Sequence, residues 1–214
     1  MPKSDQPKPK KQYHHGNLRQ ALIDAGLELI AEGHGAQIDL RKVARKVGVS
    51  HTAPYRHFAD RNELMAAIAE EGLRNLADKV HRKIETVPDD FLSKLEAFAR
   101  EYVEFAIAHP QLMREMFSGI NTDYDAHPTL RQALLYLFEP LVSTLKQSQA
   151  ADEIAKTEYV HLTLIIWSMI HGFSALVVEN YVIRKSLQGT EAIDNMVHLC
   201  VQTLYHGLAR KDTL

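Results

Sequence analysis

The stretch VSHTAPYRHF, from Val49 to Phe58, gathers side chains that suit contact with a polyanion. It holds two histidines, a threonine, a tyrosine and an arginine, and it contains no acidic residue. Hydroxyl, imidazole and guanidinium groups can donate hydrogen bonds to phosphate oxygens and to the edges of bases. The stretch therefore indicates a nucleic-acid contact, although Pro54 is an unusual residue in a helix that carries such a contact.

The segment before this stretch has the pattern of two helices. Apolar residues recur at helical spacing from Leu18 up to the Gly33-His-Gly35 sequence, which is expected to end the first helix. Asp39 is a favourable N-cap for a second, short helix that ends at Gly48. This second helix has an apolar and a basic face, formed by Leu40, Val43, Ala44 and Val47 and by Arg41, Lys42, Arg45 and Lys46.

A third helix of about two turns is predicted over residues 50–58, with Ser50 as its N-cap and Pro54 in its first turn, where proline is tolerated. Two helices that cross around a glycine form the helix-turn-helix, whose second helix lies in the major groove of DNA. An ordinary helical hairpin with solvated charges is the alternative. The predicted DNA-binding residues are Lys10, Lys11, Arg41, Ser50, His51, Thr52, Ala53, Tyr55, Arg56 and His57.

The distribution of charge agrees with polyanion binding at the N-terminal end. Residues 1–58 carry ten lysines and arginines against five acidic residues, whereas the whole chain of 214 residues has a net charge of -2. Residues 1–12 are rich in proline and lysine and lack an apolar core. They are predicted to be a disordered basic arm rather than a signal peptide.

Cysteine usage and hydropathy indicate the compartment. The single cysteine, Cys200, excludes an internal disulfide framework and fits a reducing cytosol. The most apolar run, residues 162–178, is interrupted by Ser168, His171 and Ser174, and it is short for a bilayer. It is interpreted as a buried helix, so we expect a cytoplasmic protein with no membrane partner.

The rest of the chain is predicted to be almost entirely helical, which gives an all-α fold. Pro110 is expected to separate two helices, and Pro140 is expected to kink the helix that contains it. Asp89 with Asp90, and Asp152 with Glu153, favour helix starts. The predicted helices cover residues 62–86, 89–108, 110–117, 128–149, 153–183 and 190–210, with loops at 118–127 and 184–189.

Aromatic and methionine side chains are frequent on the inward faces of these later helices. Helical bundles bind small molecules between such faces, with a few polar groups that orient the ligand. A packed core is the alternative for each residue, and His171 could equally be a core histidine bonded to a neighbouring carbonyl. The candidate ligand-binding residues are Phe98, Tyr102, Phe105, Met113, Phe117, Tyr136, Trp167 and His171.

Small and apolar residues near the C-terminal end suggest a helix–helix contact between two chains. Glycine, serine and alanine at positions 172, 174 and 175 would allow close approach of another helix. The last predicted helix has a continuous apolar stripe, which could instead face the core of its own chain. The candidate dimer contacts are Gly172, Ala175, Met196, Cys200 and Leu204.

No residue pattern indicates an enzyme. Cys200 and His198 are two positions apart on a helix, so they point to different sides and cannot form a nucleophile–base pair. The twelve histidines include no pair spaced four apart, and the chain has no HExxH, CxxC, P-loop or Rossmann glycine motif. We therefore expect no catalytic residue, no metal and no cofactor.

From Tyr13-His-His-Gly-Asn-Leu-Arg19 through LRKVARKVGVSHTAPYRHFADRNEL, the chain resembles the tetracycline-repressor (TetR) family of bacterial transcriptional regulators. The shared pattern is a helix, a glycine turn, a serine, and then tyrosine, histidine and phenylalanine. The later sequence AHPQLMREMF, and Trp167 followed by His171-Gly172, resemble the branch of this family named for its Trp-His-Gly signature.

The resemblance implies an N-terminal three-helix helix-turn-helix domain over residues 13–60. It also implies a C-terminal all-helical domain for ligand binding and dimerisation over residues 61–214, which starts with a connecting helix at 62–86. The last two long helices would pair with those of a second copy. Arg61 stands where the family usually has lysine and joins the predicted DNA contacts, whereas Ala53 and Pro54 depart from the family pattern, so base specificity cannot be transferred.

The function expected from this resemblance is a homodimeric repressor that binds a pseudo-palindromic operator in double-stranded DNA. An unidentified small-molecule effector would release it from the operator. One alternative is a constitutive DNA-binding regulator whose C-terminal domain only dimerises. An all-helical enzyme or interaction scaffold is an alternative of another class.

Overall fold

The computed structural model describes residues 17–117, 124–187 and 189–208. Within these ranges the regular elements are helices and no strand occurs, which confirms the predicted all-α fold. The arm predicted at residues 1–12, with Lys10 and Lys11, lies outside the described residues. In chain order the elements are α1 (Leu18–Ala31), the 3₁₀ turn η1 (Gly35–Gln37), α2 (Leu40–Val47), the 3₁₀ turn η2 (Pro54–Arg56), α3 (Arg61–Ile84), α4 (Phe91–Ala108), α5 (Pro110–Phe117), α6 (Pro128–Ala150), α7 (Tyr159–Glu179), α8 (Tyr181–Ser186) and α9 (Thr190–Leu208).

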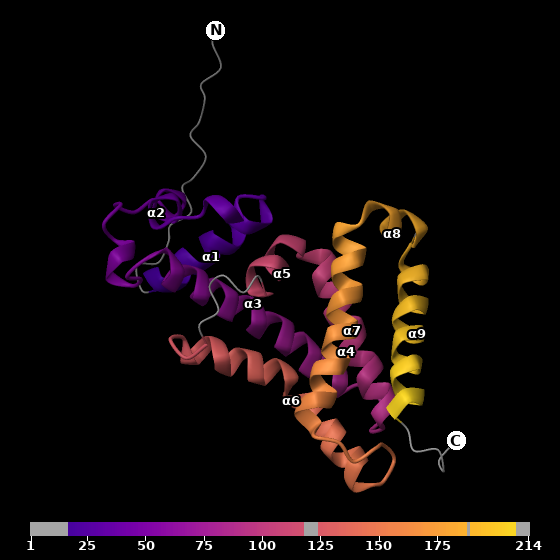
Figure 1. Cartoon of the computed structure of the whole chain (residues 1–214). Helices are drawn as coiled ribbons and strands as arrows, with labels where there is room; N and C mark the ends of the chain where they lie inside the picture. Colours follow the sequence, from indigo (N-terminus) through magenta and orange to yellow (C-terminus); the bar gives the residue numbers. More distant parts are fainter. Residues whose placement is uncertain (1–16, 118–123, 188, 209–214) are drawn as a thin grey trace.

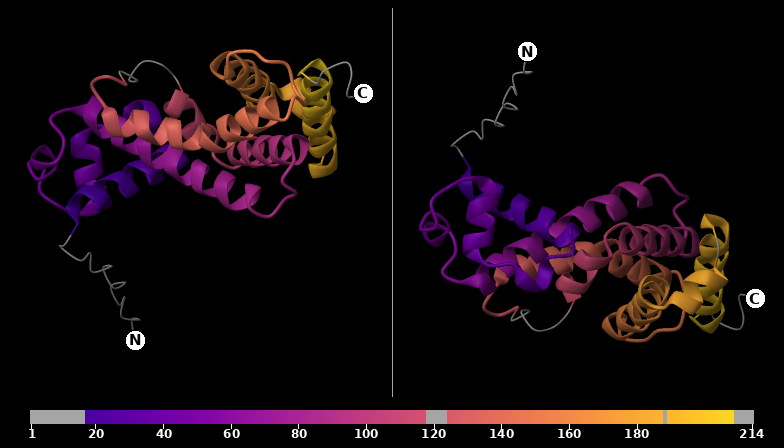
Figure 2. Two further views of the ribbon diagram at one scale, coloured as in Figure 1. Left: turned by 90° about the horizontal axis from the view of Figure 1, so that it is seen from below. Right: turned by 90° about the horizontal axis from the view of Figure 1, so that it is seen from above.

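The helices form an elongated molecule with the N-terminal elements at one end (Figures 1 and 2). We call residues 17–60, which contain α1, α2 and η2, the head. The long helix α3 leaves the head and runs into the larger part, the body, which contains α4 to α9 (Figure 1). Helices α7 and α9 lie side by side, joined through α8, at the end of the body far from the head (Figure 2).

Two local features form the predicted helices of the head. The carboxylate of Asp39 accepts a hydrogen bond from the backbone N–H of Lys42 at 2.6 Å, which confirms Asp39 as the N-cap of α2. Gly48 ends α2 with a φ of 84°, a left-handed conformation that a side chain disfavours. The two features set the length of α2 and the direction in which the chain leaves it.

The head has a hydrophobic core of its own, separate from that of the body. Leu22 of α1, Val43 of α2 and Phe58 are buried there together with Leu64 and Ile68 from the first turns of α3. From Leu73 onward, the buried residues of α3 belong to a second core shared with α4, α6, α7 and α9. The boundary between the two cores therefore lies within α3, after the domain boundary that was predicted at residue 60.

Helix α6 continues through Pro140, which cannot donate the backbone hydrogen bond that the carbonyl of Tyr136 would otherwise accept. The Nε2 atom of His81, on α3, lies 2.9 Å from that carbonyl oxygen and supplies the missing donor. The imidazole also stacks on the ring of Tyr136 at 4.2 Å between centroids. A side chain from α3 thus satisfies the backbone group that the proline leaves free in α6.

The predicted third helix over residues 50–58 is wrong. Only the single 3₁₀ turn η2 forms, because the pyrrolidine ring of Pro54 would clash with the Ser50 carbonyl in an α-helix and brings no N–H to it. That carbonyl accepts instead from the backbone N–H of Ala53 at 3.0 Å. The regular structure within residues 50–58 is therefore shorter and more tightly wound than the predicted α-helix.

The predicted helix over residues 153–183 and the loop at 184–189 also need correction. Helix α7 begins only at Tyr159, and residues 151–158 form an irregular segment in which Asp152 has a φ of 58°. The side-chain amide of Gln149 holds this segment by donating to the carbonyls of Ala155 and Thr157 at 3.0 and 2.6 Å. Beyond α7, the short helix α8 occupies much of the predicted loop.

Candidate DNA-binding turn and effector cavity

The turn η2 is anchored by two buried residues and directs its polar residues outward. Pro54 and Phe58 are buried in the head, and the backbone N–H of Phe58 donates to the carbonyl of Pro54 at 3.0 Å. Tyr55 and Arg56 lie between these anchors and are exposed, Tyr55 to 52%. The turn therefore has a buried side that holds it in the head and an exposed side that is free to make contacts.

The residues that precede η2 extend this exposed surface. His51 and Thr52 are exposed, whereas Ala53 and His57 are half-buried. The hydroxyl of Ser50 lies 3.2 Å from that of Thr52, and this is the side-chain hydrogen bond it makes in the described part of the chain. Ser50 thus orients a neighbouring contact residue rather than capping a helix.

Two of the basic residues in this region have partners inside the head. The ammonium group of Lys46 lies 3.1 and 2.8 Å from the carboxylates of Glu28 and Glu32, and hydrogen bonds to these groups raise the pKa of Lys46. The Nε atom of Arg61 donates to the carbonyl of Ile38 at 2.8 Å, so its guanidinium braces the segment before α2. Arg41, in contrast, is exposed on the outer face of α2.

In the body, three of the predicted ligand-binding residues are joined by hydrogen bonds. The indole Nε1–H of Trp167 donates to the hydroxyl of Tyr102 at 2.9 Å, and that hydroxyl lies 2.9 Å from Nδ1 of His171. Tyr102 is fully buried, and burial raises the pKa of its hydroxyl well above its ordinary value. Burial also lowers the pKa of His171, which favours a neutral imidazole.

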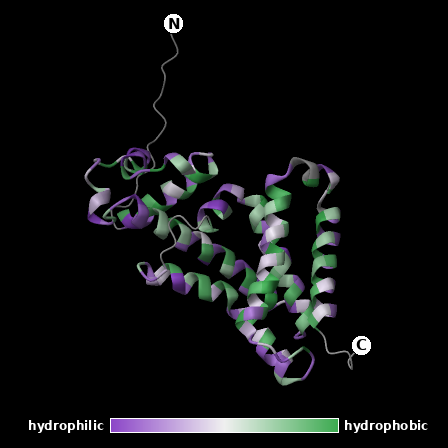
Figure 3. Cartoon of the chain, in the orientation of Figure 1, coloured by the Kyte–Doolittle hydropathy of each residue, from purple (hydrophilic) through white to green (hydrophobic). Residues whose placement is uncertain are grey.

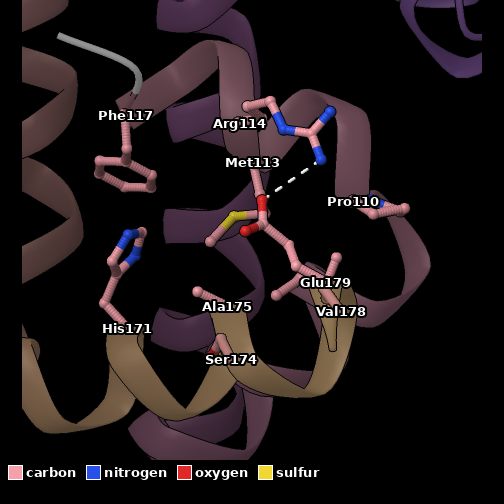
Figure 4. Close-up of a pocket in the computed structure, with 10 residues that line it drawn as sticks. Pro110, Met113, Arg114, Phe117, His171, Ser174, Ala175, Val178 and Glu179 are labelled. Carbon is pink, nitrogen blue, oxygen red and sulfur yellow. Dashed lines mark hydrogen bonds and ion pairs between the residues drawn. The ribbon is translucent and has the colours of Figure 1, made fainter. Parts of the chain in front are cut away.

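A cavity of about 240 Å³ lies beside this group, between α5 and the second half of α7 (Figure 4). The rings of Phe117 and His171 face one another across one end of it, 5.1 Å apart and nearly perpendicular. At the other end the guanidinium of Arg114 meets the carboxylate of Glu179 at 3.2 Å. The residues that line the cavity are Ala106, Pro110, Met113, Arg114, Phe117, His171, Ser174, Ala175, Val178 and Glu179.

The predicted ligand-binding set is only partly brought together. Met113, Phe117 and His171 line the cavity, whereas Phe98, Tyr102 and Trp167 lie behind it in the same aromatic cluster. Phe105 points elsewhere, into a cleft between α1, α3, α4 and α5.

Tyr136 does not join this set, because it lies on the face of α6 that meets α3. Its hydroxyl donates to the carboxylate of Asp78 at 3.2 Å, and its ring is stacked on His81. Sequence reasoning missed Arg114 and Glu179. These two residues are 65 positions apart, and no local pattern relates them.

The predicted dimer contacts also separate into different environments. Leu204 is 5% exposed and belongs to the core of its own chain, because α9 turns this side toward α4 and α7. Ala175 lines the cavity, and Gly172, Met196 and Cys200 are half-buried. The strongly exposed apolar residues of this region are others: Val160, Leu164, Ile165 and Leu176 on α7 and Leu199 on α9.

The described residues were searched for a metal site and for a helix that could cross a membrane. No group of three or more histidine, cysteine, aspartate or glutamate side chains there could hold a metal ion. Among the described helices, α7 is the one that is long and apolar enough to cross a membrane. Of its most apolar 18 residues, 28% are buried. Figure 3 shows the hydrophobic residues that run along α7 and α9.

Two family descriptions match the chain. "Bacterial regulatory proteins, tetR family" matches residues 22–68, which cover most of the head and the start of α3. "Tetracyclin repressor-like, C-terminal domain" matches residues 95–204, which are just over half of the chain. The matched ranges correspond to the two parts that contain the exposed turn and the cavity.

Individual proteins give similar results. The chain is 25% identical over 120 residues to the HTH-type transcriptional regulator Mb1846 of Mycobacterium bovis, a match that covers 56% of this chain and 51% of that protein. It therefore spans about half the length of this curated relative. A protein of unknown function from Rhodococcus sp. RHA1 has a similar structure, with a TM-score of 0.77, 29% identity, and 94% of this chain and 100% of that chain covered.

A more distant structure shares the fold alone. The transcriptional regulator FadR of Bacillus subtilis, solved in complex with stearoyl-CoA, has a TM-score of 0.64 and 16% identity. The alignment covers 85% of this chain and 96% of that chain.

Proposed function

The chain belongs to the TetR family of bacterial transcriptional regulators, and on that premise we propose that it is a cytoplasmic repressor controlled by a small molecule. In this proposal a homodimer binds a pseudo-palindromic operator, and an effector in the body releases it. The main support for control by an effector is the position of α5, which lines the cavity and also contacts the head.

The head provides the DNA contact in this proposal. Tyr55 and Arg56 would donate to phosphate oxygens, because both are exposed on a turn held by buried residues. His51 and Thr52 would reach base edges from the same surface. Two such turns in a dimer would enter successive major grooves, ~34–36 Å apart.

Helix α5 provides the link to the cavity. Met113, Arg114 and Phe117 line the cavity from one side of this helix. On its other side, Leu112 packs against the cores of both head and body. A ligand that displaces α5 would therefore move the support of the head and change the spacing of the two turns.

At two glycines, α5 packs closely against its neighbours. Met116 of α5 lies where a side chain of Gly72 on α3 would be, since a Cβ atom there would come within 2.7 Å of its sulfur. Glu115 of α5 lies equally close to Gly35 of η1. Because close-packed elements shift as units rather than deform, an effector would act on α5, η1 and α3 together.

The exposed apolar face of α7 supports the homodimer. Leu164 and Leu176 are about half exposed in one chain, and Leu199 of α9 is 57% exposed. Exposed large apolar residues on two neighbouring helices are costly in water and are typical of an interface. We expect Leu164→Glu with Leu199→Glu to give monomers in sedimentation velocity, while the wild type sediments as a dimer.

A binding titration tests the function as a whole. Fluorescence anisotropy with the promoter beside the chain's own gene should give saturable, salt-dependent binding. Tyr55→Ala with Arg56→Ala should weaken binding by about 100-fold, because two phosphate contacts are lost in each copy. No binding at low salt, or no change in the double variant, would contradict the proposal.

The rivals differ from this proposal in measurable ways. A constitutive regulator would bind the promoter but would show no thermal stabilisation by apolar compounds and no release from the promoter.

We also infer a place in the Trp-His-Gly branch of the family, which the hydrogen bonds of Trp167 and His171 support. An enzyme or scaffold is disfavoured by relatives that are transcription regulators.

A further inference from the structure

The hydrogen bonds behind the cavity have a fixed direction. The indole nitrogen of Trp167 is only a donor, so the Tyr102 oxygen accepts from it. The hydroxyl hydrogen of Tyr102 then needs an acceptor, and Nδ1 of His171, at 2.9 Å, is the remaining atom bonded to it. Tyr102 therefore donates to His171, and Nδ1 carries no proton.

The opposite assignment would leave a buried polar group unsatisfied. If Nδ1 carried a proton and donated to Tyr102, the hydroxyl hydrogen of this fully buried side chain would have no acceptor. A neutral imidazole has one N–H, and burial lowers the pKa of His171 and so favours the neutral form. The proton of His171 is therefore on Nε2.

The Nε2–H group opens into the cavity. His171 lines the cavity, and Nε2 makes no hydrogen bond within the described residues. No buried side-chain nitrogen or oxygen in the same ranges lacks a partner, so Nε2 is exposed to solvent, and the cavity that His171 lines is an open space beside its ring. Its ring faces Phe117 at one end of the space, where an entering molecule would meet it (Figure 4).

The other polar groups around the cavity already have partners. The hydroxyl of Ser174 donates to the carbonyl of Ile170 at 2.8 Å. Arg114 and Glu179 neutralise each other at the far end, and Arg114 also donates to Gln111 at 3.1 Å. The rest of the wall is carbon and sulfur from residues such as Met113 and Val178. At the end of the cavity formed by Phe117, the imidazole is thus the free donor, whereas the half-exposed guanidinium of Arg114 lies at the far end with Glu179 and Gln111 as partners.

We propose that the cavity binds a compact, uncharged apolar compound with one carbonyl group, such as a ketone or an ester, whose carbonyl oxygen accepts a hydrogen bond from Nε2–H of His171. A cavity of about 240 Å³ is smaller than the ~300 Å³ at which pockets for drug-sized ligands begin. Arg114 and Glu179 are already paired with each other at the end opposite the donor, so no unpaired cation among the lining residues would attract an anionic ligand. That this compound is the effector rests on the proposed function, whereas its binding does not.

The first test needs no ligand. In ¹⁵N–¹H correlation spectra of the dimer, the His171 signals should show a protonated Nε2 and an unprotonated Nδ1. Tyr102→Phe should remove this preference, because Nδ1 loses its donor. A matched control is Tyr205→Phe, since the Tyr205 hydroxyl makes no hydrogen bond among the described residues. A protonated Nδ1 in the wild type would overturn the proposal.

The second test compares three probes of similar size by the fluorescence of Trp167. Acetophenone has the acceptor, ethylbenzene lacks it, and benzoate adds a negative charge. We expect acetophenone to bind roughly tenfold more tightly than either of the others, and His171→Phe to abolish the difference. Equal binding of the first two, tightest binding of benzoate, or no saturable binding of acetophenone would overturn the proposal.

Separate readouts distinguish this inference from the proposed function. Selective binding of acetophenone without any effect on promoter binding would support the ligand class but contradict its role as effector. Loss of selectivity, with promoter binding still dependent on Tyr55 and Arg56, would overturn the ligand class and leave the DNA-binding function intact.

Discussion

The head and the cavity hold their functional groups by different means. In the head, the exposed residues follow one another in a single turn, and Pro54 and Phe58 fix that turn from inside. In the body, the free donor of His171 depends on Tyr102 and Trp167, which lie 69 and 4 positions away in the sequence. A contiguous segment thus presents the proposed DNA contacts, whereas residues from two helices, α4 and α7, together orient the proposed ligand contact.

This difference affects how each region responds to substitution. An exposed residue of the turn can change without affecting its neighbours, because each side chain points into solvent. A change in the hydrogen-bonded group of the body alters every member, since a lost partner leaves a buried polar atom unsatisfied. The exposed turn of the head should therefore tolerate substitution more readily than the hydrogen-bonded group of the body.

Phe58→Ala gives the largest expected effect, because it removes a ring that is 1% exposed in the small core of the head. The loss should be about 3–5 kcal/mol for that core and should abolish promoter binding. Trp167 is the one tryptophan in the sequence and lies in the body. In urea, helical circular dichroism should therefore fall before the fluorescence of Trp167 changes.

Tyr55→Ala is the control. Removal of this exposed side chain should reduce promoter binding without changing the unfolding transition seen by circular dichroism or by Trp167 fluorescence. If the circular dichroism and the Trp167 fluorescence of Phe58→Ala both show the whole loss of stability in one transition, α3 couples the two cores into one cooperative unit. The distinction between head and body would then be only geometric.

Tyr102→Phe is expected to have the next largest effect, because it leaves the indole N–H of Trp167 and Nδ1 of His171 without partners. The free energy of unfolding should fall by about 1–3 kcal/mol. Urea unfolding monitored by Trp167 fluorescence measures the change. Tyr205→Phe should change it by less than about 0.5 kcal/mol, and an equal loss in the two variants would argue against the hydrogen-bonded group.

The same contrast explains what the sequence could predict. The cap at Asp39 and the end at Gly48 depend on neighbouring residues, so the pattern predicts α2 with few errors. The third helix is the exception in the head. The prediction places Pro54 in the first turn after Ser50 and takes proline to be tolerated there, but the Pro54 ring still meets the Ser50 carbonyl, and a 3₁₀ turn forms instead.

In the body, residue types were predictable but their partners were not. The pattern selects Tyr102, Trp167 and His171, yet their hydrogen bonds depend on how α4 and α7 cross. Tyr136 has the same composition signal and lies against α3 instead, because helical periodicity gives a buried face but not the helix that covers it.

A double-mutant cycle at His81 and Pro140 tests the contact between α3 and α6 within the body. His81→Ala should cost about 1 kcal/mol, because the Tyr136 carbonyl loses its donor. In Pro140→Ala the new backbone N–H can satisfy that carbonyl, so His81→Ala should cost about 0.5–1 kcal/mol less there. Urea unfolding of the four proteins gives the coupling, and additive losses would mean that His81 acts only through stacking.

The smallest expected effect concerns acid sensitivity, which should originate in the body more than in the head. Burial raises the pKa of Glu96, but hydrogen bonds from Arg100 and His198 outweigh it and hold the pKa below its ordinary value of 4.5. Arg100 also meets Asp194 of α9 at 2.8 Å, so the cluster joins α4 to α9. A carboxylate with a lowered folded pKa stabilises the fold above its unfolded pKa and loses that contribution as the pH falls toward the lowered value.

Glu96→Gln should therefore remove a few tenths of a kcal/mol at pH 7 and flatten the loss of stability below pH 4.5. Glu32→Gln is the matched variant in the head. A hydrogen bond from Lys46 lowers the pKa of Glu32 as well, but its side chain is 52% exposed and water screens the pair. Urea unfolding from pH 7 to 3 compares them. A larger effect of Glu32→Gln would contradict the view that the partly buried cluster of the body contributes more to acid sensitivity than the exposed ion pair of the head.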